Sequence, residues 1–502
     1  MQKGFLTRVR VATAVCILIA LVIVARLYVL QILHGHTYAA RADAQSTSPQ
    51  TLLDRGTIYF TSKNGAQVAA ATLQSSSSTV KRLYPGGTLA AQELGFVAYN
   101  ADTELKGRYG LERYYEETLG RSGGDLYANF FVELFGSVRS AIHGGQERGD
   151  IVTTIEPTVQ GELEKTLETY SAQWHPRFSG GIVMDPKTGE ILAMAINPTF
   201  DLNSFNKVED ITVFGNQMVE RVYEMGSIMK PLTVAAGIDS GAITEHTTYD
   251  DTGCIEVDKK KICNFDGKPR GVVPVQEVLS QSLNVGASFV AKEMGPSVMR
   301  NYFLDKYKFG SETGIDLPAE QHGLVANLQS KNKVEYYTAA FGQGIAITPV
   351  ATVRALATLA NGGNLVVPHL VRSIHYTSGV SRDVAWGEPE QVLKQETAAT
   401  ISRMLTKVVD ESLANGTLKL EHYSIAAKTG TAQISNPAGG GYYPDKYLHS
   451  FFGYFPSFDA KFIVFLFAYE PVGAKYASQT WVPPFKELTK FLINYYQIPP
   501  DR

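Results

Sequence analysis

Cysteine is scarce in this chain of 502 residues, which has only Cys16, Cys254 and Cys263. Three cysteines are too few for a disulfide-rich scaffold, and no other cysteine or histidine adjoins the last two, so a zinc site there is not favoured. A surplus of charge is also missing: the net charge is −3, and no overall field indicates a nucleic-acid partner. Repeats of fixed period are absent as well. With 44% hydrophobic and 19% charged residues, the composition predicts a globular chain long enough for more than one domain.

Long apolar runs are rare too, with one exception near the N-terminus. Residues 11–33 read VATAVCILIALVIVARLYVLQIL. At about 1.5 Å per residue they would extend roughly 34 Å, enough for a hydrocarbon core of about 30 Å. The basic residues before the run favour a cytoplasmic tail of residues 1–10, and Arg26 lies near the outer end, where its side chain could reach the interface. We therefore predict a transmembrane helix that is retained in the cell membrane, with the rest of the chain outside the cytoplasm.

A cleaved signal peptide is the competing interpretation. The uninterrupted apolar run from Val11 to Ala25 has a suitable length, and Ala42-Asp43-Ala44 resembles a cleavage site. That site lies far beyond Ala25, however, and hydrophobicity continues through LYVLQIL. The retained anchor is therefore favoured.

The segment CIEVDKKKIC, residues 254–263, has the pattern of a short β-hairpin. A two-residue turn at 258–259 would pair residues 254–257 with residues 263–260, and would set Cys254 opposite Cys263 at a non-hydrogen-bonded position. Side chains approach most closely at such positions. In an oxidising compartment the two cysteines could form a disulfide worth about 2–3 kcal/mol, and two free thiols are the alternative.

Two regions follow the predicted anchor. Residues 34–149 hold short strand-like runs and turns without a dense catalytic constellation, so we interpret them as a small β-rich pedestal. Residues 150–502 mix helical and strand patterns, which predicts an α/β sandwich whose sheet joins distant parts of the chain. The individual predictions are a helix at 159–170, hairpins at 180–195 and 450–470, and a closing helix at 484–496 with proline in its first turn.

The tetrapeptide S-x-x-K occurs four times, and its context separates the copies. Ser78 ends a run of serines, Ser330 lies in a polar stretch, and Ser204 has no apolar helix after it to bury its lysine. Ser227 alone follows a glycine and precedes PLTVAAGI, a segment able to form a core helix. Because residues three apart share a helix face, Lys230 can reach the Ser227 hydroxyl.

The Ser227–Lys230 pair matters because a serine hydroxyl needs a base to become a nucleophile. A lysine at its ordinary pKa of about 10.4 is protonated and cannot act as that base. Burial and a neighbouring cation both lower a lysine pKa, so a core position beside a second cation would activate it. A serine N-cap followed by a surface lysine is the alternative for any single S-x-x-K sequence.

Two further motifs follow in order along the chain. Ser282-Leu283-Asn284 is flanked by apolar residues, unlike the S-x-N copies that begin at Ser62 and Ser330. Lys428-Thr429-Gly430-Thr431 follows a strand-like run, whereas the other K-T-G, at 187–189, lies in a predicted hairpin turn. We expect Gly430 to let a ligand approach the strand closely. Each motif is weak alone, but the ordered set is that of penicillin-binding proteins and serine β-lactamases.

The chain as a whole resembles a class B penicillin-binding protein, a monofunctional peptidoglycan D,D-transpeptidase. Beyond the motifs, the resemblance rests on RGTIYFTSKNG, YPGGTLAAQELGFV, GRYGLERYYEETLG, TTIEPTVQ and AFGQGIAITPVATVRALATLANGG. The chain departs from the family at Met225, where proline is frequent, at Ala427, where glycine is frequent, and in its short pedestal. The resemblance implies the penicillin-recognising serine transpeptidase fold, in which helices sandwich an antiparallel sheet beside a helical subdomain.

The resemblance also implies how the acylation step would proceed. Ser227 would attack the carbonyl between the last two D-alanines of a stem peptide, with Lys230 as the general base. Ser282, assisted by Lys428, would relay a proton to the leaving amine. β-Lactams would acylate the same serine because they imitate the D-Ala-D-Ala end.

The remaining motif residues would hold the substrate. Asn284 would bind the substrate amide and help position Lys230, while Thr429 and Thr431, with Gly430 between them, would bind the terminal carboxylate. Backbone N–H groups of Ser227 and Thr431 would form the oxyanion hole, in which the loss of one donor typically costs about 10²–10³ in rate. No metal or organic cofactor is implied.

An amine from a neighbouring stem peptide would resolve the acyl-enzyme into a cross-link. The family usually works beside a membrane-embedded SEDS-type glycan polymerase, and we expect the span and the pedestal to contact it. A D,D-carboxypeptidase and a catalytically weak scaffold for cell-wall proteins are the alternatives. A β-lactamase, a β-lactam sensor and a bifunctional synthase fit less well, because the chain shows no deacylating group, no signalling domain and too few residues before 150.

Overall fold

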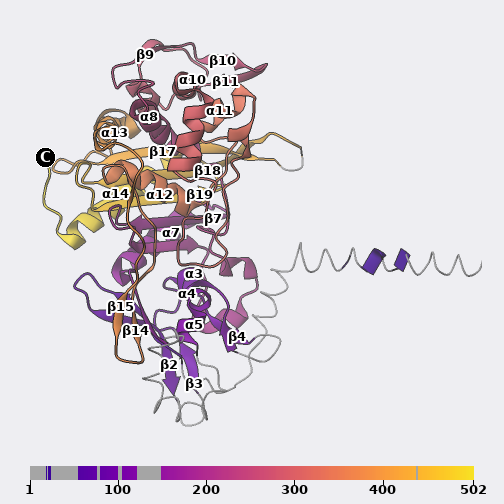
Figure 1. The fold of residues 1–502 in the computed structure, drawn as a ribbon, viewed down its shortest axis with the longest axis vertical. Coiled ribbons are helices and arrows are strands. Elements are labelled where there is room, and N and C mark those ends of the chain that lie inside the picture. Colours follow the sequence, from indigo (N-terminus) through magenta and orange to yellow (C-terminus); the bar gives the residue numbers. More distant parts are fainter. Residues whose placement is uncertain are drawn as a thin grey trace, which may run out of the picture.

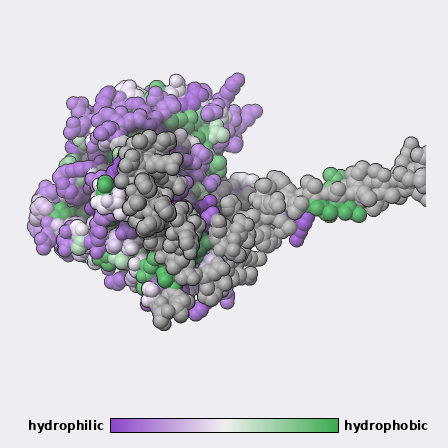
Figure 2. Space-filling model, turned by 60° about the horizontal axis from the view of Figure 1, so that its bottom comes forward, coloured by the Kyte–Doolittle hydropathy of each residue, from purple (hydrophilic) through white to green (hydrophobic). Residues whose placement is uncertain are grey.

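The computed structural model describes residues 18–19, 21–23, 26, 55–75, 80–99, 105–120, 148–436 and 439–502. The predicted cytoplasmic tail and most of the predicted anchor lie outside these residues. The described part of the anchor is helical, and its five apolar side chains, 53–63% exposed, appear green at the right of Figure 2. Across the described residues, no helix is both long enough and apolar enough to span a membrane.

A five-stranded antiparallel sheet forms the centre of the molecule, in the order β17-β18-β19-β7-β8 (Figure 1). The predicted hairpins are present as β7 (Phe178–Met184) with β8 (Ile191–Asn197), and β18 (Tyr442–Phe455) with β19 (Phe462–Tyr469). β19 pairs with β7, so the sheet joins distant parts of the chain, as predicted. β17 (Ala426–Ser435), which carries the K-T-G motif, is an edge strand.

Helices cover both faces of this sheet (Figure 1). α7 (Pro157–Trp174) and α14 (Ala477–Tyr496) pack together on one face, where the rings of Tyr170 and Trp481 stack with centroids 3.7 Å apart. α8 (Lys230–Asp239), α12 (Pro349–Ala360) and α13 (Gln395–Lys407) form the other layer. Every residue of α12 is buried, as expected for a helix at the centre of a large core.

The start of α14 differs from the prediction. The helix begins at Ala477, so Pro483 and Pro484 lie inside it rather than in its first turn. A capping box between Tyr476 and Gln479 starts the helix, and the indole N–H of Trp481 donates to a carbonyl of β18. These contacts hold the first turns in place although proline removes backbone donors.

A helical subdomain lies above the sheet in Figure 1 and contains α9 (Gln276–Ser280), α10 (Asn284–Arg300) and α11 (Lys333–Ala339). Its hairpin of β10 (Cys254–Val257) and β11 (Lys260–Cys263) has the predicted register, from Cys254 opposite Cys263 to Val257 opposite Lys260. A disulfide joins Cys254 to Cys263. The neighbouring ribbon pairs β9 (Thr248–Asp251) with β12 (Gly271–Pro274).

The lower part of the molecule is built on a six-stranded sheet, in the order β15-β14-β6-β1-β2-β3. The predicted boundary at residue 149 falls inside β6 (Gly149–Thr153), and β14 (Val371–Tyr376) and β15 (Ser381–Asp383) come from the later region. This sheet therefore joins the two predicted regions. Its earlier strands are β1 (Ile58–Thr61), β2 (Gln67–Ser75) and β3 (Val80–Leu83).

Shorter elements complete the described chain. They are α3 (Ala91–Leu94), β4 (Val97–Tyr99), β5 (Leu105–Gly107), α4 (Gly110–Tyr114), α5 (Glu116–Leu119), η3 (Leu202–Lys207), η4 (Ile211–Phe214), η5 (Gly226–Met229), η6 (Asn301–Lys306), η7 (Ala326–Gln329), β13 (Asn364–Leu365), β16 (Glu390–Gln391), η8 (Val408–Ser412) and η9 (Leu413–Gly416).

Candidate active site

Three separate segments of the chain bring the motifs together at the junction of the sheet and the helical subdomain. Ser227 lies in η5, Lys230 begins α8, Ser282 precedes α10, and Lys428 lies on β17. The ammonium groups of Lys230 and Lys428 lie 3.1 and 3.0 Å from the Ser282 hydroxyl oxygen. The second motif thus links the first to the third through a single oxygen atom.

Lys230 is completely buried, and its Nζ also donates to the Ser282 carbonyl oxygen at 2.5 Å. Burial lowers the pKa of Lys230 well below its usual value, and the charge of Lys428 lowers it further. Burial also lowers the pKa of Lys428 to about 7. Within the described residues neither lysine has a carboxylate partner, so a neutral amine is available near neutral pH.

Ser227 is half-buried and belongs to a 3-10 turn that leads directly into α8. Residues three apart eclipse one another in a 3-10 helix, which keeps Ser227 and Lys230 on one side of the turn. Among the described residues the Ser227 hydroxyl has no hydrogen-bond partner, and the Lys230 amine is bonded to Ser282 instead. Proton transfer from Ser227 therefore needs a small shift of the lysine or a path through Ser282.

At Gly430 the close approach that the structure shows is made by the protein itself, and the predicted approach of a ligand stays a prediction. A Cβ at Gly430 would lie 2.3 Å from Ser450 Oγ and 2.7 Å from the Met225 carbonyl oxygen. The segment that carries the nucleophile packs there, and the Ser450 hydroxyl donates to the same Met225 oxygen at 2.8 Å. The glycine is required because η5 lies directly against β17.

The two threonines of the third motif lie on the other face of β17. Lys428 and Gly430 are buried, whereas Thr429 and Thr431 are half-buried, in the alternation expected of a strand. The backbone N–H of Ala477, the first residue of α14, donates to Thr431 Oγ1 at 3.0 Å. Because that oxygen already accepts a hydrogen bond, the hydroxyl proton of Thr431 is left to donate to a ligand.

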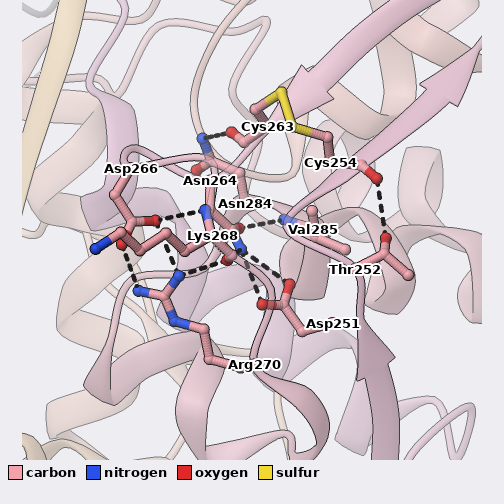
Figure 3. The surroundings of a disulfide bond; sticks show 10 residues. All are labelled: Asp251, Thr252, Cys254, Cys263, Asn264, Asp266, Lys268, Arg270, Asn284 and Val285. Atoms are coloured by element: carbon pink, nitrogen blue, oxygen red, sulfur yellow. Dashed lines mark hydrogen bonds and ion pairs between the residues drawn. A yellow bond between two sulfur atoms is a disulfide. The ribbon is translucent and has the colours of Figure 1, made fainter.

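Asn284 is held by the disulfide hairpin rather than by Lys230 (Figure 3). Its amide nitrogen donates to the Cys263 carbonyl oxygen at 2.9 Å. Ser282 just before it has a φ of 57°, a left-handed conformation that is uncommon for a serine. The predicted contact between Asn284 and Lys230 is absent among the described hydrogen bonds, and Cys263, Asn264 and Ala477 are site residues that no short motif could reveal.

The rejected motif copies lie elsewhere. Ser204 is in η3 with an exposed Lys207, and Lys187 of the other K-T-G forms an exposed ion pair with Asp459. The Ser62 hydroxyl bonds Asn64 in an exposed turn, and Ser330 is half-buried while the lysine of its motif, Lys333, is exposed. Ser78 lies outside the described residues. The geometry therefore agrees with the choice of motif copies made from sequence context.

Comparison with known proteins gives matches over most of the chain. A family model described as the penicillin binding protein transpeptidase domain matches residues 180–490. Stage V sporulation protein D of Bacillus subtilis is 30% identical over 401 residues, which cover 78% of this chain and 60% of that protein. Peptidoglycan D,D-transpeptidase MrdA of Acinetobacter baumannii is 28% identical over 401 residues, which cover 72% of this chain and 57% of that protein. The chain thus spans about 60% of the length of these relatives.

Among solved structures, penicillin binding protein 3 of Mycobacterium tuberculosis, in its apo form, superimposes with a TM-score of 0.75. The two sequences are 25% identical, and the match covers 91% of this chain and 98% of the other. The same Mycobacterium protein has also been solved in complex with aztreonam.

Proposed function

We propose a function from one premise: this chain belongs to the family of penicillin-binding protein transpeptidases, whose model matches residues 180–490. The proposed activity is that of a peptidoglycan D,D-transpeptidase, which cross-links stem peptides through a serine acyl-enzyme and is inhibited by β-lactams. The observation that carries the proposal is the convergence of two buried lysines on the Ser282 hydroxyl beside Ser227. Burial lowers the pKa of Lys230 well below its usual value, which favours the neutral amine that a serine nucleophile needs as its base.

The proposed acylation uses the four polar groups of this cluster. Lys230, in its neutral form, takes the Ser227 hydroxyl proton as the serine oxygen attacks the carbonyl carbon. Ser282 passes a proton to the departing D-alanine nitrogen, and Lys428 replaces it. The peptide C–N bond breaks, free D-alanine leaves, and an ester to Ser227 remains. The amine of a second stem peptide then attacks this ester, forms a new amide and returns the proton to the serine.

The binding roles are part of the same proposal. Thr429 and Thr431 bind the terminal carboxylate, for which the free hydroxyl proton of Thr431 is suited. Asn284 orients the substrate amide, and the backbone N–H groups of Ser227 and Thr431 stabilise the oxyanion. Lys428 adds positive charge beside the carboxylate.

We also propose the domain arrangement and location. Residues 11–33 would anchor the chain in the cell membrane with residues 1–10 in the cytoplasm, residues 34–149 would form the pedestal, and residues 150–502 the transpeptidase domain. The exposed apolar side chains within residues 18–23 support an anchor. A SEDS-type polymerase is the proposed partner of the anchor and pedestal.

Labelling with a fluorescent penicillin tests the nucleophile. The wild-type protein should bind the label covalently, whereas Ser227→Ala should not, and Ser204→Ala should label like wild type. Equal labelling of wild type and Ser227→Ala would refute the assignment. Release of D-alanine from a peptide ending in D-Ala-D-Ala, with and without an acceptor amine, separates a transpeptidase from a carboxypeptidase: only the former yields a cross-linked product.

A further inference from the structure

We propose that Asn264 is a positioning residue for this reaction, because it caps the helix that presents Asn284 to the substrate. The proposal rests on the proposed function. It concerns the junction between the disulfide hairpin and α10, which Figure 3 shows in detail.

Helix α10 lacks a capping side chain of its own. Its N-cap residue is Leu283, which has no acceptor, and no side chain within the helix start satisfies the first backbone donors. Asn264, from a different part of the chain, supplies the missing acceptor: its Oδ1 accepts the backbone N–H of Val285 at 3.1 Å. Val285 is 3% exposed, so without Asn264 this donor would have no water to replace the lost partner.

The orientation of the Asn264 amide follows from its partners. Its Nδ2 lies 2.9 Å from each carboxylate oxygen of Asp251, which can only accept hydrogen bonds. Oδ1 must therefore face Val285, whose N–H can only donate. Asp251 is fully buried and Asn264 is 3% exposed, so Asp251 holds Asn264 in the capping orientation.

The adjacent residue connects the same junction to the active site. Cys263, fixed by the β10–β11 pairing and by its disulfide to Cys254, accepts the amide hydrogen bond of Asn284 on its carbonyl oxygen. Two consecutive residues, 263 and 264, thus hold two consecutive residues, 284 and 285. A shift of this junction would turn the Asn284 side chain.

The consequence is that Asn264 acts on the substrate through Asn284. Loss of the cap would loosen the first turn of α10 and misplace the Asn284 amide, and a misplacement of about 1 Å can lower a rate by as much as about 100-fold. Lys230 and Lys428 would keep their hydrogen bonds to the Ser282 hydroxyl, so acylation would be slowed rather than abolished.

A double-mutant cycle tests this route. The measured quantity is the second-order rate constant of acylation by a fluorescent penicillin that carries an acylamino side chain. Asn264→Ala should lower it about 10-fold in the wild-type background and less than about 2-fold in the Asn284→Ala background, because the two residues act in series. An equal loss in both backgrounds would refute the route through Asn284, as would an unchanged rate in folded Asn264→Ala.

Two matched variants control for damage to the hairpin. Thr252→Ala removes an exposed hydroxyl that bonds the Cys254 carbonyl oxygen in the same hairpin, and it should leave the rate unchanged. Asp251→Asn keeps an oxygen that can accept from Asn264, so it should lose far less than Asn264→Ala. If Asp251→Asn lost as much as Asn264→Ala, an acceptor oxygen at residue 251 would not be enough to hold the capping orientation, and that part of the proposal would be wrong.

Amide hydrogen exchange measures the opening of the first turn of α10 without an activity assay. In folded Asn264→Ala, the peptide that contains residues 283–287 should exchange about 10-fold faster than in wild type, while peptides from α12 should not change. Unchanged exchange at residues 283–287 would show that Asn264 is not the cap. Failure of wild-type labelling at Ser227, by contrast, would overturn the proposed function and leave the exchange result standing.

Discussion

The charge of Lys428 should set the pH at which the protein becomes acylated, and a pair of substitutions can measure this. The Nζ atoms of Lys230 and Lys428 bond the same oxygen at 3.1 and 3.0 Å, so they lie at most about 6.1 Å apart. Two unit charges at that separation repel by about 3 kcal/mol for an effective dielectric constant of about 20. Since about 1.4 kcal/mol is a factor of ten, a repulsion of this size changes the ratio of neutral to charged Lys230 by about 100-fold.

The sign of the effect follows from which form is the base. Burial lowers the pKa of Lys230 most, and the positive charge of Lys428 lowers it further. Lys428→Met removes that charge, so the pKa of Lys230 should rise and less of the amine should be neutral at any given pH. In the pH–rate profile of acylation, the acid limb, where the rate rises as Lys230 loses its proton, should then move to higher pH by about one unit or more. Lys428→Arg retains a cation and should leave the limb close to its wild-type position.

The assay is the rate of acylation by a fluorescent penicillin between about pH 5 and pH 9, with folding checked at each pH by circular dichroism. Both variants should be slower than wild type because the carboxylate loses a specific partner, so the position of the limb is compared rather than its height. A limb in Lys428→Met that coincides with wild type, or that lies at lower pH, would contradict the view that Lys230 is the base under the influence of Lys428.

Three further substitutions test other parts of the structure. Lys230→Met should abolish acylation yet raise the melting temperature at pH 7 by about 2–4 °C. The reason is that Lys230, whose pKa is lowered by folding, binds fewer protons in the folded protein than in the unfolded chain, which destabilises the wild type. Calorimetry should show that the stability difference between variant and wild type shrinks as the pH rises toward the pKa of the unfolded lysine. Thr431→Val should raise KM about 10-fold for a peptide with a terminal carboxylate but not for its amide, with Thr431→Ser as the control, in a D-alanine release assay. In the lower part of the molecule, the buried carboxylate of Glu112 forms ion pairs with Arg55 and Arg82, each at 2.7 Å. Glu112→Gln should lower the free energy of unfolding in urea by about 3–5 kcal/mol, because both buried arginines lose this carboxylate. Glu116→Gln, at a partly exposed partner of Arg55, should lower it by about 1 kcal/mol or less.

The sequence predicted best what depends on local pairing. The hairpin at 254–263 has its predicted register because a two-residue turn fixes the pairing of the strands beside it. The hairpins β7–β8 and β18–β19 were predictable because each consists of two apolar strands on either side of a short segment with turn residues. Context also selected Ser227 among four copies of its motif, because only that lysine is followed by a helix that can bury it.

The sequence alone did not predict which distant segments contact one another. Periodicity shows that a residue is buried but not what buries it, so it could not show that β14 pairs with β6. The same limit applies at Gly430, where the sequence did not predict the close approach of the Met225 backbone. Ala477 and Asn264 act through one backbone hydrogen bond each, and no pattern of residue types marks such a contact.

The lysine pair itself shows why three weak motifs identify a site only in combination. Two buried cations without a carboxylate partner destabilise a fold, and so does a serine held at a φ of 57°. Either feature alone would be an unexplained cost of about 1–3 kcal/mol or more, but both converge on the single oxygen of Ser282. A core as large as this one can tolerate that cost. What the two crowded, desolvated amines gain is a pKa below the usual lysine value, which favours the neutral form of the amine. The instability of this cluster is therefore the physical reason that its lysines can act as a base and a proton donor beside Ser227.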